Sequence, residues 1–267
     1  MPFTENNGVR LHWDEAGSGT PILLVMGHRY SSKMWYPAIA ALAAEHRVIW
    51  FDNRGTGETD TTPKVTVREM AADALAVMDA AGVRRAHIYG VSMGGVIVQE
   101  VAFLQPDRLV SLIVGCSGAL TADKPRAPAF MRLLYYLPPS LLQLLTPSRG
   151  GDKGYGAAAT PQAIAADLAV LAKDKFTTKG VIAQAAAMAD YRVTLEAVAG
   201  LTMPALVLHG DEDSLVPIKW GEELAQILPQ GRFVRIPGAG HNYMVAAPDM
   251  ANRAVLDFTR EIDGRQP

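Results

Sequence analysis

The sequence Gly90-Val91-Ser92-Met93-Gly94 places one serine between two glycines, after a strand-like run and before a helix-like one. A sharp turn from strand to helix holds its central residue in a strained backbone conformation, and glycines on either side relieve the crowding. The serine oxygen then lies at a helix N-terminus, where the helix dipole favours developing negative charge. The stretch therefore predicts that Ser92 is a nucleophile.

The composition is typical of a globular protein with enough apolar residues for a large core. The chain has 267 residues, of which 49% are hydrophobic and 19% charged, and its formal net charge is −2. This balance gives no electrostatic reason to expect binding to nucleic acid or to an acidic membrane surface. No stretch reaches the length of a transmembrane helix, so we expect no membrane partner.

The compartment and the oligomeric state are expectations from weaker signals. The single cysteine, Cys116, rules out an intramolecular disulfide and suits a reducing compartment. Its apolar neighbours indicate the end of a buried strand and therefore a structural thiol. The first residues lack the basic and apolar regions of a signal peptide. We expect a cytoplasmic protein that is a monomer or a homodimer.

Strand and helix patterns alternate through most of the chain. Short apolar runs bounded by turn residues predict strands, and longer periodic stretches predict helices. The expected strands are 9–14, 21–26, 48–51, 85–89, 109–114, 205–208 and 233–236, and the expected helices are 35–44, 67–81, 96–102, 220–228 and 249–262. This alternation predicts an α/β fold with a mainly parallel sheet and helices on both faces.

The alternation breaks between residues 119 and 201. This segment is punctuated by prolines and is otherwise rich in alanine and leucine, which favour helices, as in 163–172 and 181–189. We interpret it as a helical insertion in one domain. The predicted core domain is then 1–118 together with 202–267, and the predicted cap or lid is 119–201.

Three reactive residues follow predicted strands, in the order Ser92, Asp213, His241. Open α/β sheets bind ligands beyond the carboxyl ends of their strands, so these side chains are expected to meet there. A serine hydroxyl needs an adjacent base, and the loop that carries His241 contains two glycines and could return to Ser92. A carboxylate such as Asp213 would fix the tautomer of that histidine.

Other residues compete for these roles. Asp211 and Glu212 are alternatives to Asp213 as the acid, although the spacing from Gly210 favours Asp213. Four further histidines lie within or beside expected strands and helix ends, where a structural role is the better interpretation; they are His12, His46, His87 and His209. Asp52 and Arg54 are expected to organise the loop after their strand through a salt bridge or hydrogen bonds to the backbone.

Together, these motifs resemble the α/β-hydrolase superfamily, over essentially the whole chain. The resemblance is carried by Gly90 to Gly95, by the Gly210-x-x-Asp213-x-x-Val216-Pro217 segment, by Gly238-Ala239-Gly240-His241 and by Phe51-Asp52-Asn53-Arg54-Gly55-x-Gly57. It implies a Ser-His-Asp triad and a cap inserted after the sixth of eight strands. It does not identify a substrate, because this fold supports many chemistries.

The resemblance also implies an oxyanion hole built from two backbone N–H groups. Met93, after the nucleophile, supplies the first, and His28 supplies the second by position. The family usually has His-Gly-x in the second loop, whereas this chain has Met26-Gly27-His28. A polar side chain is therefore lost at residue 26, while Gly27 still allows the turn and the backbone donor.

The substrate-binding candidates come from that loop and from the expected cap. In the loop, His28 or Arg29 is suspected to bind a polar part of the substrate; the helix-like stretch 130–137 could line an acyl pocket or only pack on the core. The full set is Gly27, Arg29, Tyr30, Met131, Leu134, Tyr135, Met188 and Tyr191. Neither metal-ligand spacing nor a phosphate-binding loop is present in the sequence, so we expect no metal and no cofactor.

The resulting hypothesis is a serine hydrolase that cleaves a carboxylic ester or lactone with an apolar body. Serine at residue 92 argues against haloalkane dehalogenase or epoxide hydrolase chemistry, for which similar proteins use aspartate. A C–C bond hydrolase is the enzymatic alternative, and a cofactor-free perhydrolase activity could accompany either. A small-molecule receptor with the same triad and slow turnover is the alternative from another class.

Overall fold

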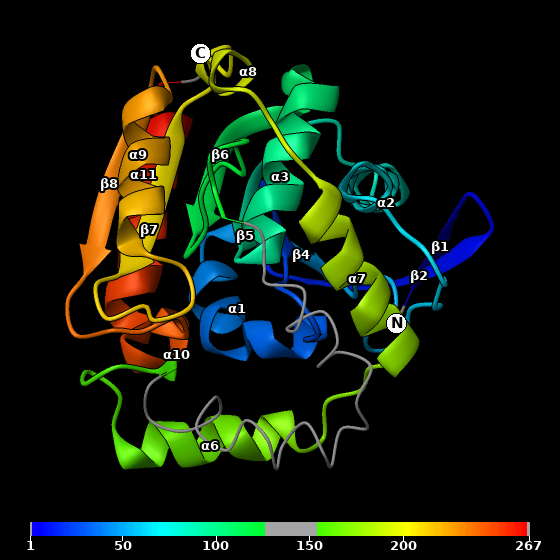
Figure 1. The fold of residues 1–267 in the computed structure, drawn as a ribbon, viewed down its shortest axis with the longest axis horizontal. Helices are drawn as coiled ribbons and strands as arrows, with labels where there is room; N and C mark the ends of the chain where they lie inside the picture. Colours follow the sequence, from blue (N-terminus) through cyan, green and yellow to red (C-terminus); the bar gives the residue numbers. More distant parts are fainter. Residues whose placement is uncertain (1, 126–153, 266–267) are drawn as a thin grey trace.

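The computed structural model describes residues 2–125 and 154–265. Its centre is one eight-stranded sheet in the order β1-β2-β4-β3-β5-β6-β7-β8 (Figure 1). The pairs from β4 to β8 are parallel, whereas β2 runs antiparallel to β1 and to β4. The predicted mainly parallel α/β sheet is therefore confirmed. The strands are β1 (Phe3–Asn6), β2 (Val9–Ala16), β3 (Thr20–Val25), β4 (His46–Phe51), β5 (Ala86–Val91), β6 (Leu109–Gly115), β7 (Ala205–Gly210) and β8 (Gly231–Ile236).

Helices cover both faces of the sheet. One apolar cluster packs α2, α3 and α9 against one face, and a second packs α1 and α11 against the other. The α-helices are α1 (Tyr36–Leu42), α2 (Val67–Ala80), α3 (Met93–Leu104), α6 (Pro161–Leu171), α7 (Thr178–Asp190), α8 (Leu195–Ala199), α9 (Ile218–Ile227), α10 (Tyr243–Ala246) and α11 (Pro248–Asp263). Two 3-10 helices are η1 (Ser32–Trp35) and η2 (Pro106–Arg108).

The central strand β3 shows why both faces need cover. Leu23 and Val25 belong to one apolar cluster, while Ile22 and Leu24 belong to the other. Successive side chains of a strand point to opposite faces, so a strand that is apolar at every position must be buried on both. All four side chains are fully buried. The continuous apolar run in the sequence therefore sets the three-layer arrangement.

Several short elements were absent from the expected pattern. Residues 35–44, expected as one helix, divide into η1 and α1, with Pro37 in the first turn of α1. Strand β1 pairs with β2 through a turn at Asn7-Gly8, where both residues have positive φ, of 49° and 77°. Asn-Gly is the usual dipeptide of a tight hairpin, so the sequence did contain this signal. α8 and α10 are too short to show a helical period.

Within 119–201, the structure describes three helices that lie outside the sheet layers. Figure 1 shows α6 at the lower edge of the view, below α1 and α10, and α7 beside α2. α6 contacts η1 and α10, while α7 contacts α2. α6 therefore rests against elements near the carboxyl end of the sheet, whereas α8 contacts α9 and leads into the amino end of β7.

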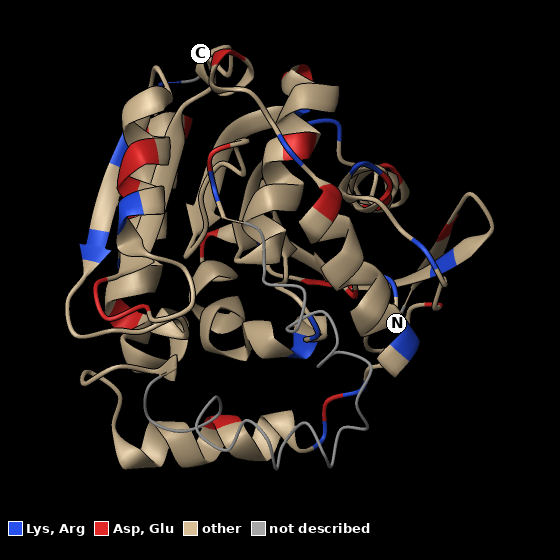
Figure 2. Ribbon diagram, in the orientation of Figure 1, with Lys and Arg blue, Asp and Glu red and all other residues tan. Residues whose placement is uncertain are grey.

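Charged residues of both signs are mixed on the surface elements. Figure 2 shows basic and acidic positions close together on α9 and β8. There, Arg235 donates a hydrogen bond of 2.9 Å to Glu222, and Lys219 lies 3.7 Å from Glu223. Among the described residues, no helix is both long and apolar enough to span a membrane.

Candidate active site

Ser92 lies in the turn between β5 and α3, in the strained conformation that the sequence predicted. Its φ and ψ are 55° and −119°, a region that residues other than glycine rarely adopt. Neighbouring side chains have no room, because a Cβ at Gly90 would lie 2.1 Å from the Gly94 oxygen and one at Gly94 would lie 2.0 Å from the Val25 oxygen. The two glycines are therefore required by the close approach of backbone to the turn.

The loops after β7 and β8 bring Asp213 and His241 to this serine. His241 Nε2 lies 3.0 Å from Ser92 Oγ, and His241 Nδ1 lies 2.8 Å from Asp213 Oδ2. Ser92 is separated from Asp213 and His241 by more than 100 positions in the sequence, yet the three residues form a continuous hydrogen-bonded chain. This is the geometry of a nucleophile, its base and the carboxylate that orients the base.

Asp213 is held by hydrogen bonds on both carboxylate oxygens. Oδ1 accepts from the backbone N–H groups of Leu215 and Val216, at 2.8 and 2.9 Å. Oδ2 faces His209 Nε2 at 3.2 Å as well as His241. Burial would raise the pKa of Asp213, but the hydrogen bonds from His209 and His241 outweigh it and hold the pKa well below its usual value. The group therefore remains a carboxylate, able to accept from His241.

The environment of His241 combines opposing influences. Burial lowers the pKa of this imidazole, while the adjacent Cys116 and the hydrogen bond to the Asp213 carboxylate raise it, and the net direction is upward. Cys116 Sγ lies 4.0 Å from His241 Nε2, on the nitrogen that faces Ser92. The imidazolium form of His241 is therefore stabilised in this site.

The competing carboxylates have other partners. Asp211 Oδ1 accepts the Gly238 N–H at 2.7 Å, which ties together the two loops that carry the acid and the base. Glu212 accepts the Ala157 N–H at 2.8 Å. Neither carboxylate has a hydrogen bond to His241 among those found in the described residues. Both carboxylates therefore fix the positions of loops, while Asp213 alone of these three contacts His241 in the described structure.

The loop after β3 lies directly against Ser92. A Cβ at Gly27 would lie 3.2 Å from Ser92 Cβ, so only a glycine backbone fits there without displacing its neighbour. Asn53 Nδ2 donates to the Met26 oxygen at 2.8 Å and fixes the start of the loop. On the other side of the serine, Met93 is the first residue of α3, so its N–H belongs to the unsatisfied donors of a helix N-terminus.

The polar side chains of this loop turn toward the helices of 119–201. His28 Nε2 lies 2.9 Å from the Val181 oxygen of α7, and burial lowers the pKa of His28, which favours the neutral ring. The Arg29 guanidinium lies 4.8 Å from the centre of the Phe176 ring. Burial raises the pKa of Tyr30 and keeps its phenol neutral.

The alpha/beta hydrolase family matches residues 19–254, which is most of the chain. The chain belongs to this family. It is 32% identical to RutD of Azorhizobium caulinodans, named only provisionally as a carbamate hydrolase, over 98% of this chain and 100% of that protein. The esterase of Thermogutta terrifontis superposes with a TM-score of 0.85 at 28% identity, over 97% of both chains. An enzyme that degrades N-acyl homoserine lactones superposes with a TM-score of 0.77 at 25% identity, over 96% of this chain and 100% of that one.

Of the five substrate-binding candidates in 119–201, the structure of this hydrolase describes two. Met131, Leu134 and Tyr135 lie outside the described residues. Met188 and Tyr191 pack against the apolar cluster on the α3 face of the sheet. The Tyr191 hydroxyl donates to Glu100 at 2.7 Å, eight residues along α3 from Ser92, so the structure does not bring this phenol to the nucleophile.

Two contacts of the hydrolase site were missed by sequence reasoning. Cys116, expected as a structural thiol, is buried as expected but lies against His241 and has a φ of 39°. His209 was also expected to be structural, yet it contacts the carboxylate of Asp213. Cys116 directly follows β6, and His209 is the last residue but one of β7. That position was the available signal, since the carboxyl ends of parallel strands meet at one edge of the sheet.

Asp52 and Arg54 organise loops, as the sequence indicated. Asp52 Oδ1 accepts from the backbone N–H and the hydroxyl of Ser32, at 2.8 and 2.7 Å. Arg54 forms two hydrogen bonds with Asp73, at 2.5 and 2.8 Å, and both side chains are almost fully buried. These residues thus connect the loop after β4 to η1 and to α2.

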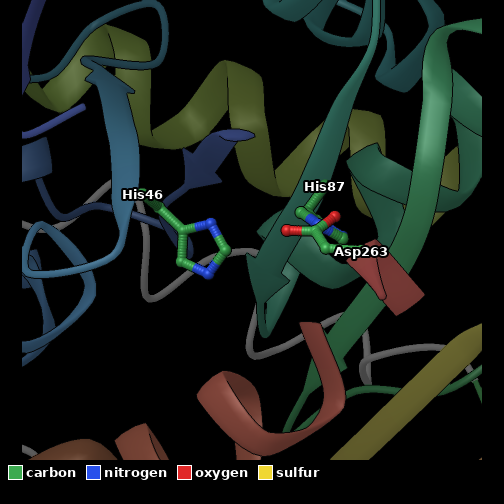
Figure 3. A group of neighbouring side chains, drawn as sticks. All are labelled: His46, His87 and Asp263. Atoms are coloured by element: carbon green, nitrogen blue, oxygen red, sulfur yellow. The ribbon is translucent and has the colours of Figure 1, made fainter. Parts of the chain in front are cut away.

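A cluster of side chains of the kinds that bind metals lies far from Ser92, at the amino ends of the strands. Figure 3 shows His87 beside Asp263, with the ring of His46 turned toward them. His87 Nε2 lies 3.0 Å from Asp263 and its Nδ1 2.7 Å from Ser111, while His46 is bonded to Thr259 and to a backbone oxygen. Burial lowers the pKa of His87 to about 4. Each ring nitrogen already has a protein partner, which agrees with the structural role expected for both histidines.

Proposed function

We propose that this hydrolase is a serine esterase or lactonase, which cleaves a carboxylic ester or lactone with an apolar body. The observation that carries the proposal is the hydrogen-bonded chain from Ser92 Oγ through His241 to Asp213, set on a strained turn at a helix N-terminus. The similarity to an esterase and to a lactone-degrading enzyme supports this substrate class.

The proposed reaction has two halves. Ser92 Oγ attacks the carbonyl carbon while His241 Nε2 accepts the hydroxyl proton, and the N–H groups of Met93 and His28 stabilise the oxyanion. The tetrahedral intermediate collapses as the alkoxy group leaves with the proton from His241. Water then attacks the acyl-enzyme and gives a proton to His241. The second tetrahedral intermediate collapses as the Ser92 oxygen leaves with that proton, and the carboxylic acid is released. Asp213 stays ionised throughout and stabilises the imidazolium.

We also propose that residues 119–201 form a cap over this site. Support comes from two contacts with loops that carry site residues. The segment at 154–158 bonds to the His241 loop, since Gly240 donates to the Tyr155 oxygen at 2.7 Å and Asn242 to the Gly154 oxygen at 2.9 Å. α7 bonds to the loop after β3 through the Val181 oxygen.

A substrate panel with an active-site label tests the proposed function. Aryl esters of increasing acyl length and simple lactones should be turned over repeatedly, and a fluorophosphonate should modify Ser92, located by peptide mass. Aryl carbamates belong in the panel, because the relative named provisionally as a carbamate hydrolase makes them the second candidate. Labelling with at most one turnover would favour the receptor alternative, turnover of C–C substrates alone would favour that hydrolase class, and an unmodified Ser92 would contradict the nucleophile.

The pH dependence of the reaction should reflect the raised pKa of His241. Only the neutral imidazole accepts the Ser92 proton, so activity is present above the pKa of His241 and is lost as the pH falls through it. Because the environment raises this pKa, we expect the acid limb of kcat/KM at a pH above about 6.5, the usual histidine value. A pH–rate profile with a substrate that does not titrate measures it. An acid limb well below that pH would contradict a raised pKa of His241.

A further inference from the structure

The backbone turn at residues 26–29 must be held in one conformation because it lies against the nucleophile. A Cβ at Gly27 would lie 3.2 Å from Ser92 Cβ, and the next residue but one, Arg29, has a φ of 78°. A residue other than glycine in this region is strained and persists only where its surroundings fix it. The expected oxyanion donor, the His28 N–H, lies between these two residues. Its position is therefore set by whatever holds both ends of the turn.

The two ends of the turn are held by amide side chains from different parts of the chain. At the start, Asn53 Nδ2 donates to the Met26 oxygen at 2.8 Å. At the end, Gln184 Oε1 accepts the Arg29 N–H at 2.9 Å. The same Gln184 donates from Nε2 to the Arg54 oxygen at 2.8 Å. The strained residue is thus anchored to α7 on one side and, through α7, to the loop after β4.

Gln184 is unusual for a glutamine because it is fully buried. Its relative exposure is 0%, in the middle of a helix whose polar residues would ordinarily face solvent. Both ends of its amide are used on backbone groups of two different core loops. A glutamine suits this place because it offers one acceptor for an N–H and one donor for a carbonyl, without a charge.

We infer that Gln184 is a positioning residue, which sets the turn at Arg29 and thereby holds the His28 N–H toward the oxyanion formed at Ser92. The inference rests on the proposed serine hydrolase function. It also gives the segment 119–201 a part in the chemical step, since a helix of that segment completes the support of the oxyanion loop. Among the described residues, the hydrogen bonds of Gln184 go to Arg29 and Arg54 and not to Ser92 or His241.

Kinetics of Gln184→Met and Tyr36→Phe test this role. Methionine keeps the volume of glutamine but removes both hydrogen bonds, so kcat should fall about 10- to 100-fold with KM within about threefold, because a displaced oxyanion donor weakens transition-state binding. The rate of fluorophosphonate labelling should fall with it, since that adduct also places an oxygen in the oxyanion hole. Tyr36→Phe is the matched control, since it removes one hydrogen bond from the core to α6, at Asp167, and should keep kcat close to wild type.

A second variant separates positioning from folding. In Gln184→Glu, an ionised carboxylate still accepts the Arg29 N–H, but its second oxygen faces the Arg54 carbonyl oxygen and repels it. The protonated acid has an O–H that donates to the Arg54 oxygen again. The ratio of its kcat to that of the wild type should therefore rise as the pH falls. With an active wild type, equal kcat in Gln184→Met and Tyr36→Phe, or a change in KM alone, overturns the inference. A wild type that is neither active nor labelled contradicts the proposed function itself, and the inference with it.

Discussion

Replacing Ser92 by alanine should lower kcat for ester hydrolysis about 10⁶-fold, the size of the loss when a triad nucleophile is removed from a serine hydrolase. The fold should be unaffected, for two reasons. Alanine keeps the Cβ, so the strain at a φ of 55° is unchanged. The only side-chain hydrogen bond found for Ser92 in the described structure is the one to His241. Steady-state rates, thermal unfolding and fluorophosphonate labelling should then separate chemistry from stability.

Ser117→Ala is a suitable control for this experiment. Ser117 is also a buried serine close to the carboxyl end of the sheet, on the loop that follows β6, and its side chain packs against Gly95. We expect its variant to keep both activity and labelling. Retention of most of the activity in Ser92→Ala would refute the nucleophile, and loss of activity together with unfolding would show that Ser92 supports the fold instead.

The parts of the structure that could be predicted from sequence obey local rules. A strand that is apolar at each position, such as β3, must be buried on both faces, and the residues at carboxyl ends of parallel strands must meet. These two rules predict that Ser92, Asp213 and His241 meet at one edge of the sheet, and the spacing from Gly210 favours Asp213 over its neighbours as the acid. Each rule depends only on the strand and on the few residues that follow it.

The contacts that could not be predicted join residues without a shared local pattern. In the sequence, Gln184 looks like an ordinary polar residue of an alanine-rich helix. Only the packing of α7 on the core shows that its amide accepts from the Arg29 N–H and donates to the Arg54 oxygen. His46, His87 and Asp263 meet in the same way, from two strands and the last helix. Such contacts follow from how helices dock, which depends on side-chain shape over many residues.

Asp213→Asn is expected to lower kcat about 10⁴-fold with little change in KM, as for the equivalent change in a serine protease triad. The four donors around the carboxylate explain the loss. An asparagine whose oxygen faces Leu215 and Val216 turns its amide hydrogens toward His241 and His209. His241 must then accept at Nδ1 and carry its proton on Nε2, so it has no lone pair for Ser92. In the opposite orientation, the amide hydrogens of the asparagine would face the backbone N–H groups of Leu215 and Val216, which are donors too.

Asp211→Asn is the matched control for that variant. An asparagine at 211 keeps an oxygen to accept the Gly238 N–H, so activity should stay within about threefold of wild type, as expected where one neutral hydrogen bond is retained. The pH profile adds an independent measurement, because removing the Asp213 charge removes one cause of the raised pKa of His241 and should move the acid limb to lower pH. Loss of activity in Asp211→Asn but not in Asp213→Asn would transfer the acid role to Asp211. Equally small effects of the two changes would show that neither carboxylate orients His241, in spite of the 2.8 Å between Asp213 Oδ2 and His241 Nδ1.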